Sequence, residues 1–412
     1  MLLPNYIREN KALVIERMKV RSFDAEVILD QILELDDNRK KTQQELDAIL
    51  SESNQLAKQI GELFKTGKAA EANELKVRTT ELKEKANTLK EEQNTIVEEL
   101  KQLLYQVPNV PNETVPPGKS DEDNEIILNQ GEIPVLHDKA VPHWDLAKKY
   151  DLIDFELGVK ITGAGFPVYK GKGARLQRAL ISFFLDQAVD NGYLEITPPL
   201  MINEASGYGT GQLPDKEGQM YYMQTDDLYM IPTSEVPITN MYRDVMLKES
   251  DLPLKNVGYT PCFRREAGSY GKDVRGLNRL HQFDKVEIVQ IQHPDKSYET
   301  LDLMVEHVKD LLTKLELPYR VAKLCGGDLG FTAALTFDME VYSVAQEKWL
   351  EVSSISNFEN FQANRLKCRF KDDSGKTQLV HTLNGSALAL PRILAALLEN
   401  NQTPEGIKIP KA

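Results

Sequence analysis

The feature that most constrains this chain is a heptad pattern of apolar residues within its first hundred positions. Steps of three and four residues from Ile32 to Leu63, and again from Leu75 to Leu103, land mostly on apolar side chains. Charged residues fill most of the space between them, and no proline lies between residues 5 and 107. This pattern is typical of two long helices that supercoil around one another.

The two heptad segments are separated only by FKTGKAAEAN, residues 64–73, in which Gly67 can end a helix. So short a connection makes the helices antiparallel, each roughly 50 Å long at 1.5 Å per residue. We therefore expect a coiled-coil hairpin over about 27–104. A simple dimerisation coil is the alternative, but two matched registers on either side of one turn favour the hairpin.

Proline and acidic residues separate the hairpin from the rest of the chain. Residues 105–125 carry Pro108, Pro111, Pro116 and Pro117 and then an acidic run, which indicates an extended linker without helix. Beyond it, β-type runs alternate with helical ones, and a loop joins the runs at 256–263 and 280–291, which favours antiparallel pairing. For a chain of 412 residues we expect an N-terminal domain at 1–105, a linker at 106–125 and an α+β domain at 126–412.

Bulk composition narrows the class of protein. Hydrophobic residues make up 41% of the chain, and no apolar run is long enough to cross a membrane. The N-terminal residues lack the apolar core of a secretion signal, so we expect a cytoplasmic protein. Cys262, Cys325 and Cys368 form no CxxC pair, which argues against a cysteine zinc site. The formal charge of −13 argues weakly against a nucleic-acid partner, although local basic stripes can exist within an acidic protein.

A ribbon at residues 261–291 combines strand character with a high density of arginine. Its arginines are Arg264, Arg265, Arg275 and Arg279. Because side chains alternate faces along a strand, the odd-numbered residues 279–287 share one face, and the apolar Leu280, Val286 and Ile288 share the other. The odd face presents Arg279, Phe283 and Glu287 in one line, the last two roughly 13 Å apart.

That line of side chains suits an aminoacyl-nucleotide. An aromatic ring can stack on a purine, and arginines can fork onto phosphate oxygens. A carboxylate at the far end can meet an ammonium or a hydroxyl group. The alternative is a row of surface salt bridges on an exposed sheet face, which usually contribute little.

Longer segments carry a resemblance to a known family. FRREAGSYGKDVRGLNRLHQFDKVE at 263–287 resembles motif 2 of the class II aminoacyl-tRNA synthetases, in the form that seryl-tRNA synthetases use. VHTLNGSALALPRILAALLEN at 380–400 resembles motif 3, and YLEITPPLMIN at 193–203 resembles motif 1. GTGQLP at 209–214, PTSE at 232–235, GDLGF at 327–331, EVSSISNFENFQANR at 351–365 and the N-terminal hairpin fit the same family.

This resemblance implies both a fold and an activity. The fold is an antiparallel sheet flanked by helices, with ATP bent over the surface of the sheet. The activity is ATP-dependent ligation of L-serine to tRNA(Ser) through a seryl-adenylate, releasing pyrophosphate and AMP, with tRNA(Sec) as a further substrate where it exists. Mg²⁺ bridging ATP oxygens, and a homodimer with Pro199 of motif 1 at its interface, are also implied.

The resemblance also assigns site residues one by one. Arg264 matches the arginine that holds the α-phosphate and the amino acid carboxylate, and Arg392 matches the one at the γ-phosphate; both are the candidate catalytic residues. The candidate ATP-binding set is Arg264, Arg265, Glu266, Arg279, Phe283, Glu351, Val352, Ser353, Ser354 and Arg392. The candidate serine-binding set is Thr233, Ser234, Glu235, Arg264, Glu287, Asn384 and Ser386. Glu351 and Ser354 match the family's magnesium contacts.

In the family the hairpin reaches the long variable arm of tRNA bound to the other subunit. Candidate phosphate contacts on it are Lys40, Lys41, Lys58, Lys65, Lys68, Lys76, Arg78, Lys83, Lys85 and Lys90. The glycine-rich loop at 268–276 is expected to become ordered around ATP or the tRNA acceptor end. Three alternatives remain: an amino acid:carrier-protein ligase, a non-catalytic scaffold that kept the fold, and a class II enzyme for another small amino acid.

Overall fold

The computed structural model describes residues 1–266 and 275–412. These residues form two compact units. One comprises Leu2–Glu16 and Asp24–Pro108, and the other comprises Met1, Arg17–Phe23 and Asn109–Ala412. We refer to them as the hairpin unit and the catalytic-core unit, and describe each by itself.

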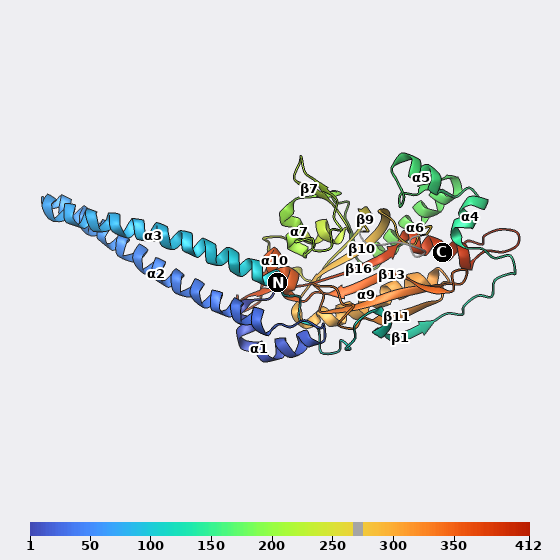
Figure 1. Ribbon diagram of the computed structural model, residues 1–412, viewed down its shortest axis with the longest axis horizontal. Helices are drawn as coiled ribbons and strands as arrows, with labels where there is room; N and C mark the ends of the chain where they lie inside the picture. The colour runs from blue at the N-terminus through green and yellow to red at the C-terminus, as the bar shows by residue number, and fades with distance from the viewer. Residues whose placement is uncertain (267–274) are drawn as a thin grey trace. The chain divides into compact units, whose positions relative to one another are not determined.

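Two long antiparallel helices dominate the hairpin unit (Figure 1). After α1 (Pro4–Lys19), α2 runs over Glu26–Lys65 and α3 over Ala69–Leu104. The chain reverses at Gly67, whose φ of +77° favours glycine over residues with a Cβ. Heptad positions such as Ile49, Leu82 and Leu89 form a buried cluster between α2 and α3. The expected intramolecular hairpin is therefore confirmed.

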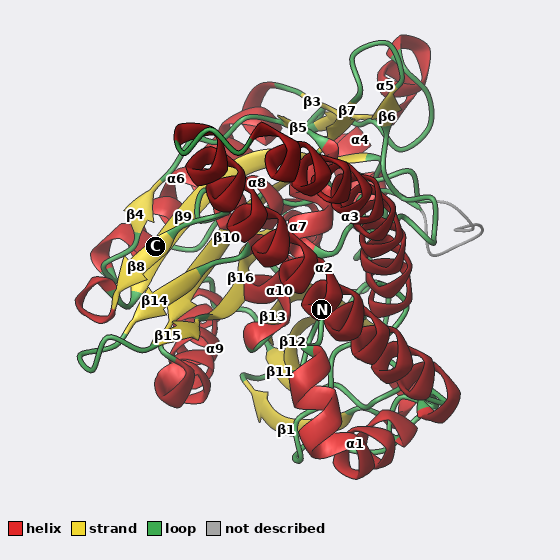
Figure 2. Ribbon diagram, turned by 90° about the vertical axis from the view of Figure 1, so that its left-hand side faces the viewer, coloured by secondary structure: helices red, strands yellow, loops and turns green. Residues whose placement is uncertain are grey.

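An eight-stranded sheet forms the middle of the catalytic-core unit. Its strand order is β1-β11-β12-β13-β16-β10-β9-β4, and its strands lie side by side in Figure 2. Their bounds are β1 Glu125–Gln130, β4 Leu194–Glu195, β9 Leu254–Phe263, β10 Gln282–Gln292, β11 Tyr319–Lys323, β12 Leu335–Ser343, β13 Lys348–Asn357 and β16 His381–Ala389. Neighbouring strands are antiparallel except β4 and β9, which are parallel. The expected antiparallel α+β fold is confirmed.

Helices pack on this sheet through one large apolar core. They include α6 (Gly171–Asp190), α9 (Ser297–Lys314) and α11 (Leu390–Asn400). Phe184 of α6, Met304 of α9 and Ile393 of α11 are fully buried in the same cluster as Val286 and Ile288 of β10. The even-numbered face of β10 is therefore the core face, as its alternation predicts, and the odd-numbered face is left for the cleft described below.

Smaller elements complete the catalytic-core unit. The short helices are α4 His143–Lys149, α5 Phe155–Ile161, α7 Glu204–Thr210, α8 Glu235–Asn240 and α10 Asn360–Leu366. The short strands are β2 Ile153–Asp154, β3 Val168–Tyr169, β5 Met201–Ile202, β6 Tyr222–Met223, β7 Leu228–Met230, β8 Met246–Lys248, β14 Arg369–Lys371 and β15 Thr377–Leu379. They form sheets of order β15-β14-β8, β2-β3 and β5-β7-β6.

Three local expectations need correction. The segment 105–125 contains a 3₁₀ turn at Asp121–Asp123, so it is not wholly without helix. The sequence YLEITPPLMI at 193–202 predicts one extended run. In the structure this run is interrupted between β4 and β5, where it carries adjacent prolines that supply no backbone donors. Alternation along the preceding strand predicts that Arg264 and Glu266 share a face. However, β9 ends at Phe263 and Glu266 has a φ of +47°, so the two residues do not share a strand face.

Within the described part of the chain, no helix is both long enough and apolar enough to cross a bilayer.

Candidate active site

A cleft of about 580 Å³ opens over the odd-numbered face of β10. It brings together most of the residues that the sequence singles out, from segments far apart in the chain. They are Thr233, Glu235, Arg264, Glu266, Arg279, Phe283, Glu287, Glu351, Val352, Ser353, Ser354, Asn384, Ser386 and Arg392. The structure therefore gathers the ATP-binding and serine-binding candidates into one continuous cavity.

Sheet register explains this convergence. β10 pairs with β16 so that Glu287 lies opposite Ser386, and the Ser386 hydroxyl donates to the Glu287 carboxylate over 3.2 Å. β16 also pairs with β13, where Ser356 lies opposite Asn384. The Ser353 hydroxyl then donates to the carbonyl oxygen of Ser386 over 2.5 Å. Three neighbouring strands thus supply the floor of the cleft.

Three predicted site residues do not line the cleft. The backbone N–H of Arg265 donates to the carbonyl oxygen of Gln219 over 2.9 Å, but its side chain is not part of the lining. Ser234 is fully buried below the cleft at the start of α8 and donates to the carbonyl oxygen of Gly258 over 3.5 Å. Pro199 is exposed, lies between the short strands β4 and β5, and is not among the lining residues.

One end of the cleft is built for charged and hydroxyl groups of a small molecule. The ammonium of Lys285 lies 2.7 Å from the Glu287 carboxylate and 2.8 Å from the Thr233 hydroxyl, with Lys285 8% and Glu287 2% exposed. Glu235 is also buried and accepts from Gln362 over 2.7 Å. Burial, helped by the negative charge of Glu287, raises the pKa of Glu235 to about 7. A cation that binds at this end would therefore favour the ionised form of Glu235.

Sequence reasoning missed Lys285 as a site residue, although the strand alternation places it on the same face as Phe283 and Glu287. The alternation of side chains along this strand could therefore have identified Lys285 as a site residue. Further lining residues lie within or close to the segments that carry the resemblance, but no role was assigned to them. They include Gln212, Glu217, Gln219, Asn278 and Ser356.

The other end of the cleft gathers arginines around an aromatic ring. The guanidinium of Arg264 lies over the Phe283 ring, 5.2 Å from its centroid, and its Nε donates to the carbonyl oxygen of Pro232 over 3.3 Å. Arg279 forms an ion pair with Glu266 at 3.0 Å. An aromatic face and planar cations together suit a purine base carrying phosphates.

Arg392 completes the basic end. It lies in the first turn of α11, after Pro391, which is favoured at a helix start. Its Nε donates to the carbonyl oxygen of Asn278 over 3.0 Å, and its NH1 donates to the carbonyl oxygen of Glu351 over 2.7 Å. These two partners are neutral backbone oxygens that hold the guanidinium in place, and the Glu351 carboxylate, 3.4 Å away, offsets part of its charge.

Glu351 and Ser354 lie on β13 at the same side of the cleft. The Glu351 carboxylate is half exposed and lies 3.4 Å from Arg392. No cluster of three or more His, Cys, Asp or Glu residues that could hold a metal ion occurs in residues 1–266 and 275–412. The Glu351 carboxylate and the Ser354 hydroxyl are hard oxygen donors, the type of ligand that Mg²⁺ prefers.

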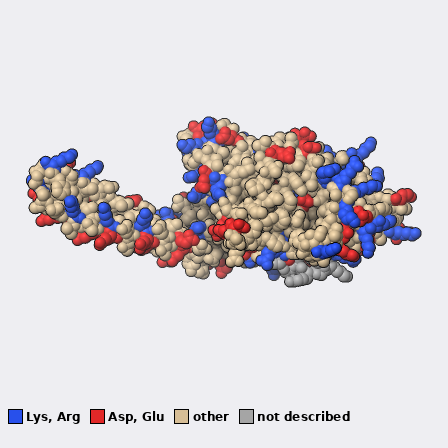
Figure 3. All heavy atoms as spheres, turned by 90° about the horizontal axis from the view of Figure 1, so that it is seen from above, with Lys and Arg blue, Asp and Glu red and all other residues tan. Residues whose placement is uncertain are grey.

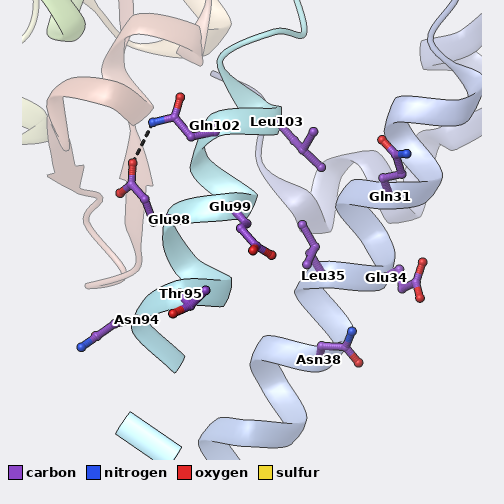
Figure 4. A pocket seen from close by; sticks show the side chains of 10 residues that line it. All are labelled: Gln31, Glu34, Leu35, Asn38, Asn94, Thr95, Glu98, Glu99, Gln102 and Leu103. Atoms are coloured by element: carbon purple, nitrogen blue, oxygen red, sulfur yellow. Dashed lines mark hydrogen bonds between the residues drawn. The ribbon is translucent and has the colours of Figure 1, made fainter. Parts of the chain in front are cut away.

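The hairpin unit has a hollow of its own, of about 950 Å³ (Figure 4). Its charged lining residues, Glu34, Glu98 and Glu99, are all acidic, and Gln102 donates to Glu98 over 2.7 Å. None of its lining residues is a lysine or an arginine. An acidic hollow repels phosphate, so the cleft over β10 is the better candidate site.

The glycine-rich loop expected to order around ATP, residues 268–276, falls largely outside the described residues.

Comparison with known proteins agrees with the geometry. Residues 1–111 match the family model "Seryl-tRNA synthetase N-terminal domain", and residues 221–401 match "tRNA synthetase class II core domain (G, H, P, S and T)". A serine–tRNA ligase of Salinibacter ruber is 50% identical over 408 residues, covering 98% of this chain and 95% of the relative. One from a Geobacter species is 46% identical, covering 98% and 96%.

Solved structures agree with these matches. A seryl-tRNA synthetase from Pyrococcus horikoshii complexed with ATP is similar with a TM-score of 0.90 and 34% identity, covering 100% of this chain and 97% of that one. A cytoplasmic serine–tRNA ligase from Naegleria fowleri in complex with AMP has a TM-score of 0.85 at 28% identity, covering 100% and 96%. Fold, cleft and similarity over the whole chain lead to one conclusion: the protein belongs to the seryl-tRNA synthetase family of class II aminoacyl-tRNA synthetases.

Proposed function

We propose that this protein ligates L-serine to tRNA(Ser) in two steps. The serine carboxylate attacks the α-phosphorus of ATP and pyrophosphate leaves. The terminal ribose hydroxyl of the tRNA then attacks the carbonyl carbon of the seryl-adenylate, and AMP leaves. The observation that carries the proposal is the cleft over β10, which has an arginine–aromatic end and a carboxylate–ammonium end on the same strand face. The similarity to serine–tRNA ligases over the whole chain supports it.

ATP binds at the arginine–aromatic end in this proposal. The adenine stacks on Phe283, which requires the Arg264 guanidinium to move from the ring to the α-phosphate and the serine carboxylate. Glu266 accepts from the adenine amino group, and Arg279 and Arg392 contact the nucleotide from either side. The ATP and AMP complexes of the two related structures support nucleotide binding by this chain.

No side chain of the cleft acts as a nucleophile. The serine carboxylate is itself the attacking group, so the residues of the cleft align the reactants and offset the charge that grows on the transferring phosphoryl group. Arg264 contributes on the α-phosphate side and Arg392 on the γ-phosphate side. Glu351 and Ser354 would hold Mg²⁺ when it is bound, and the cation would supply further positive charge in the cleft.

Serine binds at the carboxylate–ammonium end. Its ammonium group lies between Glu235 and Glu287, where the added cation favours the ionised form of Glu235. Its hydroxyl group contacts Glu287 and Ser386, while Thr233 and Asn384 complete the pocket. Alanine lacks the hydroxyl group that contacts Glu287 and Ser386, so it forgoes these buried hydrogen bonds, which is the basis for rejecting it.

The N-terminal region provides the contact with tRNA in this proposal. On the face seen in Figure 3, Lys and Arg side chains gather towards the tip of the hairpin, and Asp and Glu side chains follow its lower edge. The basic residues of α2 and α3 suit the phosphates of the long variable arm. We assign tRNA binding to residues 1–105, a linker to 106–125 and catalysis to 126–412, with action in the cytoplasm, where protein synthesis uses charged tRNA.

The active form in this proposal is a homodimer. Pro199 is exposed beside β4, a short edge strand of the large sheet, and Leu194 of β4 is 64% exposed. Exposed apolar residues at a sheet edge favour pairing with a second copy of the chain. Sedimentation analysis tests this assignment.

Serine-dependent exchange of pyrophosphate into ATP tests the first step, and charging of tRNA(Ser) tests the second. Exchange with serine, and serine attached to tRNA, are expected. Exchange with threonine or glycine at an equal rate would favour a ligase for another small amino acid. Transfer to the phosphopantetheine of a carrier protein, without charging of tRNA, would favour a carrier-protein ligase, and absence of exchange with every amino acid would favour a non-catalytic scaffold.

A further inference from the structure

A buried acid–base pair lies beside the cleft without lining it. The side chain of His143, at the start of α4, lies 2.6 Å from Glu399 near the end of α11, measured from Nδ1 to Oε1, and both side chains are 0% exposed. The backbone N–H of His143 donates to the same oxygen over 2.8 Å. Burying a carboxylate costs free energy that only close partners offset, so the position of this pair requires an explanation.

The second ring nitrogen of His143, Nε2, contacts the backbone at Leu277, near the start of the described segment 275–412. The N–H of Leu277 donates to Nε2 of His143 over 2.8 Å. Because Nε2 accepts, the proton of the neutral ring lies on Nδ1 and is donated to Glu399. Gly276 has a φ of +67°, and a Cβ there would lie 2.2 Å from Nε2. The ring is therefore fitted against the backbone of this turn.

A second branch runs from Glu399 to Asn278 through a side-chain amide. Gln346 donates from Nε2 to both Glu399 oxygens, over 3.0 and 3.2 Å, and its Oε1 accepts from the Asn278 amide over 2.9 Å. The Ser343 hydroxyl also donates to Glu399. Burial raises the pKa of Glu399, but the hydrogen bonds from His143 and Ser343 outweigh this and keep the pKa below its usual value. The carboxylate thus stays ionised as the centre of the network.

Asn278 is where this network reaches the cleft. Its carbonyl oxygen accepts from Nε of Arg392 over 3.0 Å. Arg392 and Glu399 also belong to the same helix, α11, and lie seven residues or about two turns apart, on one side of it. The buried pair is therefore connected to the guanidinium of Arg392 both by a rigid helix and by hydrogen bonds through Leu277 and Asn278.

We infer that His143 and Glu399 are positioning residues for ATP binding: they fix the Leu277–Asn278 backbone, whose carbonyl oxygen aims Arg392 at the phosphates. The inference rests on the proposed role of Arg392. Neither Thr233 nor Glu235 takes part in the network, so its loss is expected to affect ATP and not serine.

Two substitutions at His143 separate its two contacts. His143→Asn keeps an amide donor near the place of Nδ1, facing Glu399, but removes the acceptor for the N–H of Leu277. We expect the KM for ATP in the exchange reaction to rise roughly ten-fold, since a buried N–H loses its partner, while the KM for serine changes less than about two-fold. His143→Gln places an amide oxygen near the position of Nε2, and we expect it to recover part of the affinity for ATP.

His307→Asn is the matched control. His307 is a buried histidine of α9 whose two ring nitrogens have no hydrogen-bond partner among the described residues. Its substitution is expected to lower the thermal midpoint and leave the KM for ATP unchanged. Gln346→Ala, at a half-buried position, cuts the second branch without disturbing the core, and we expect a smaller rise in the KM for ATP.

An unchanged KM for ATP in both His143→Asn and Gln346→Ala would overturn the inference, as would equal rises in the KM for ATP and for serine. If His143→Asn does not fold, Gln346→Ala decides alone. Failure of the proposed function is distinguishable, because the unmodified protein would then show no serine-dependent exchange at all.

Discussion

The hairpin unit and the catalytic-core unit differ in their ion pairs: both have exposed pairs, but the core unit also buries two pairs almost completely. On the hairpin, pairs such as Lys68–Glu71 and Arg78–Glu81 lie on the exposed surface, three residues apart along a helix. In the catalytic-core unit, Lys285–Glu287 and the His143–Glu399 pair are almost completely buried. Exposed pairs contribute little, whereas removing one partner of a buried pair leaves an uncompensated charge.

Asp36 of the hairpin unit is an exception, because its charged side chain is buried. Asp36 is 1% exposed and is surrounded by Arg8, Arg39 and Lys40. Burial raises the pKa of Asp36, but hydrogen bonds from the three cations outweigh it and lower the pKa below its usual value. Lys40 therefore has a structural partner at the base of the hairpin. The comparison teaches that charges in the core fix geometry, while most charges on the hairpin remain available to a partner molecule.

The sharpest test of the core concerns two adjacent arginines. Arg264 lines the cleft and Arg265 does not, although the sequence assigns both to ATP. We expect Arg264→Ala to lower kcat/KM for serine-dependent exchange by roughly 10² to 10³, because a cation aimed at the transferring phosphoryl group is removed. Arg265→Ala is the matched control and should stay within about three-fold of the unmodified enzyme. Equal losses in the two variants would contradict the prediction that Arg264, which lines the cleft, matters more for activity than Arg265, which does not.

A second test uses the pKa of Glu235. With a pKa of about 7 in the folded protein and 4.5 as its ordinary value, Glu235 binds a proton more readily when folded. Its contribution to stability is therefore fully present below pH 4.5 and is lost as the pH rises through 7. Glu235→Gln removes this loss, so the free energy of unfolding of the variant, relative to the unmodified protein, should increase by about 3 kcal/mol from pH 4.5 to pH 8. Urea unfolding at both pH values measures this, and a constant difference would contradict it.

The third test concerns hairpin charges that have no ion-pair partner among the described residues, such as Lys58, Lys83 and Lys90. Replacing all three with alanine is expected to weaken tRNA(Ser) binding and to reduce the slope of log affinity against log salt by about one for each phosphate that these lysines neutralise. Serine-dependent exchange should not change. Lys101→Ala, which removes a lysine paired with Glu98, is the control. An unaltered salt slope in the triple variant would show that these lysines do not face the RNA.

The smallest expected effect belongs to the exposed ion pairs. Arg78 contacts Glu52 and Glu81 on the hairpin surface, and we expect Arg78→Ala to leave the thermal midpoint of the protein unchanged. Asp36→Ala is the contrasting variant, because it leaves three cations facing a buried gap, and it should lower the midpoint measurably. Circular dichroism of the full chain measures both. Equal shifts would erase the contrast between exposed and buried charge.

Periodicity in the sequence predicts the parts of the structure that repeat. Heptads predict the paired helices, and Ile49, Leu82 and Leu89 are buried between them because the pattern places them on one side. Alternation along β10 predicts that Phe283 and Glu287 share a face opposite Val286 and Ile288. The alternation holds only within the strand: β10 begins at Gln282, so Arg279 precedes it, and Leu280 lines the cleft although alternation places it on the opposite face.

Contacts between distant segments are not predictable in this way. Arg265 follows Arg264 in the motif, but β9 has already ended at Phe263, so neighbours in sequence differ in exposure to the cleft. Ser234 points below the cleft because it begins α8. His143 and Glu399 belong to elements that meet only in the folded chain, and no spacing announces their contact.

Because Arg392 and Glu399 both lie on α11, their spacing limits which sequence changes this helix can accept during evolution. An α-helix turns by about 100° per residue. Inserting or deleting a single residue between the two would rotate the guanidinium to a different side, away from the cleft, even if every side chain were kept. The helix can therefore tolerate exchanges of amino acid type far better than changes of length.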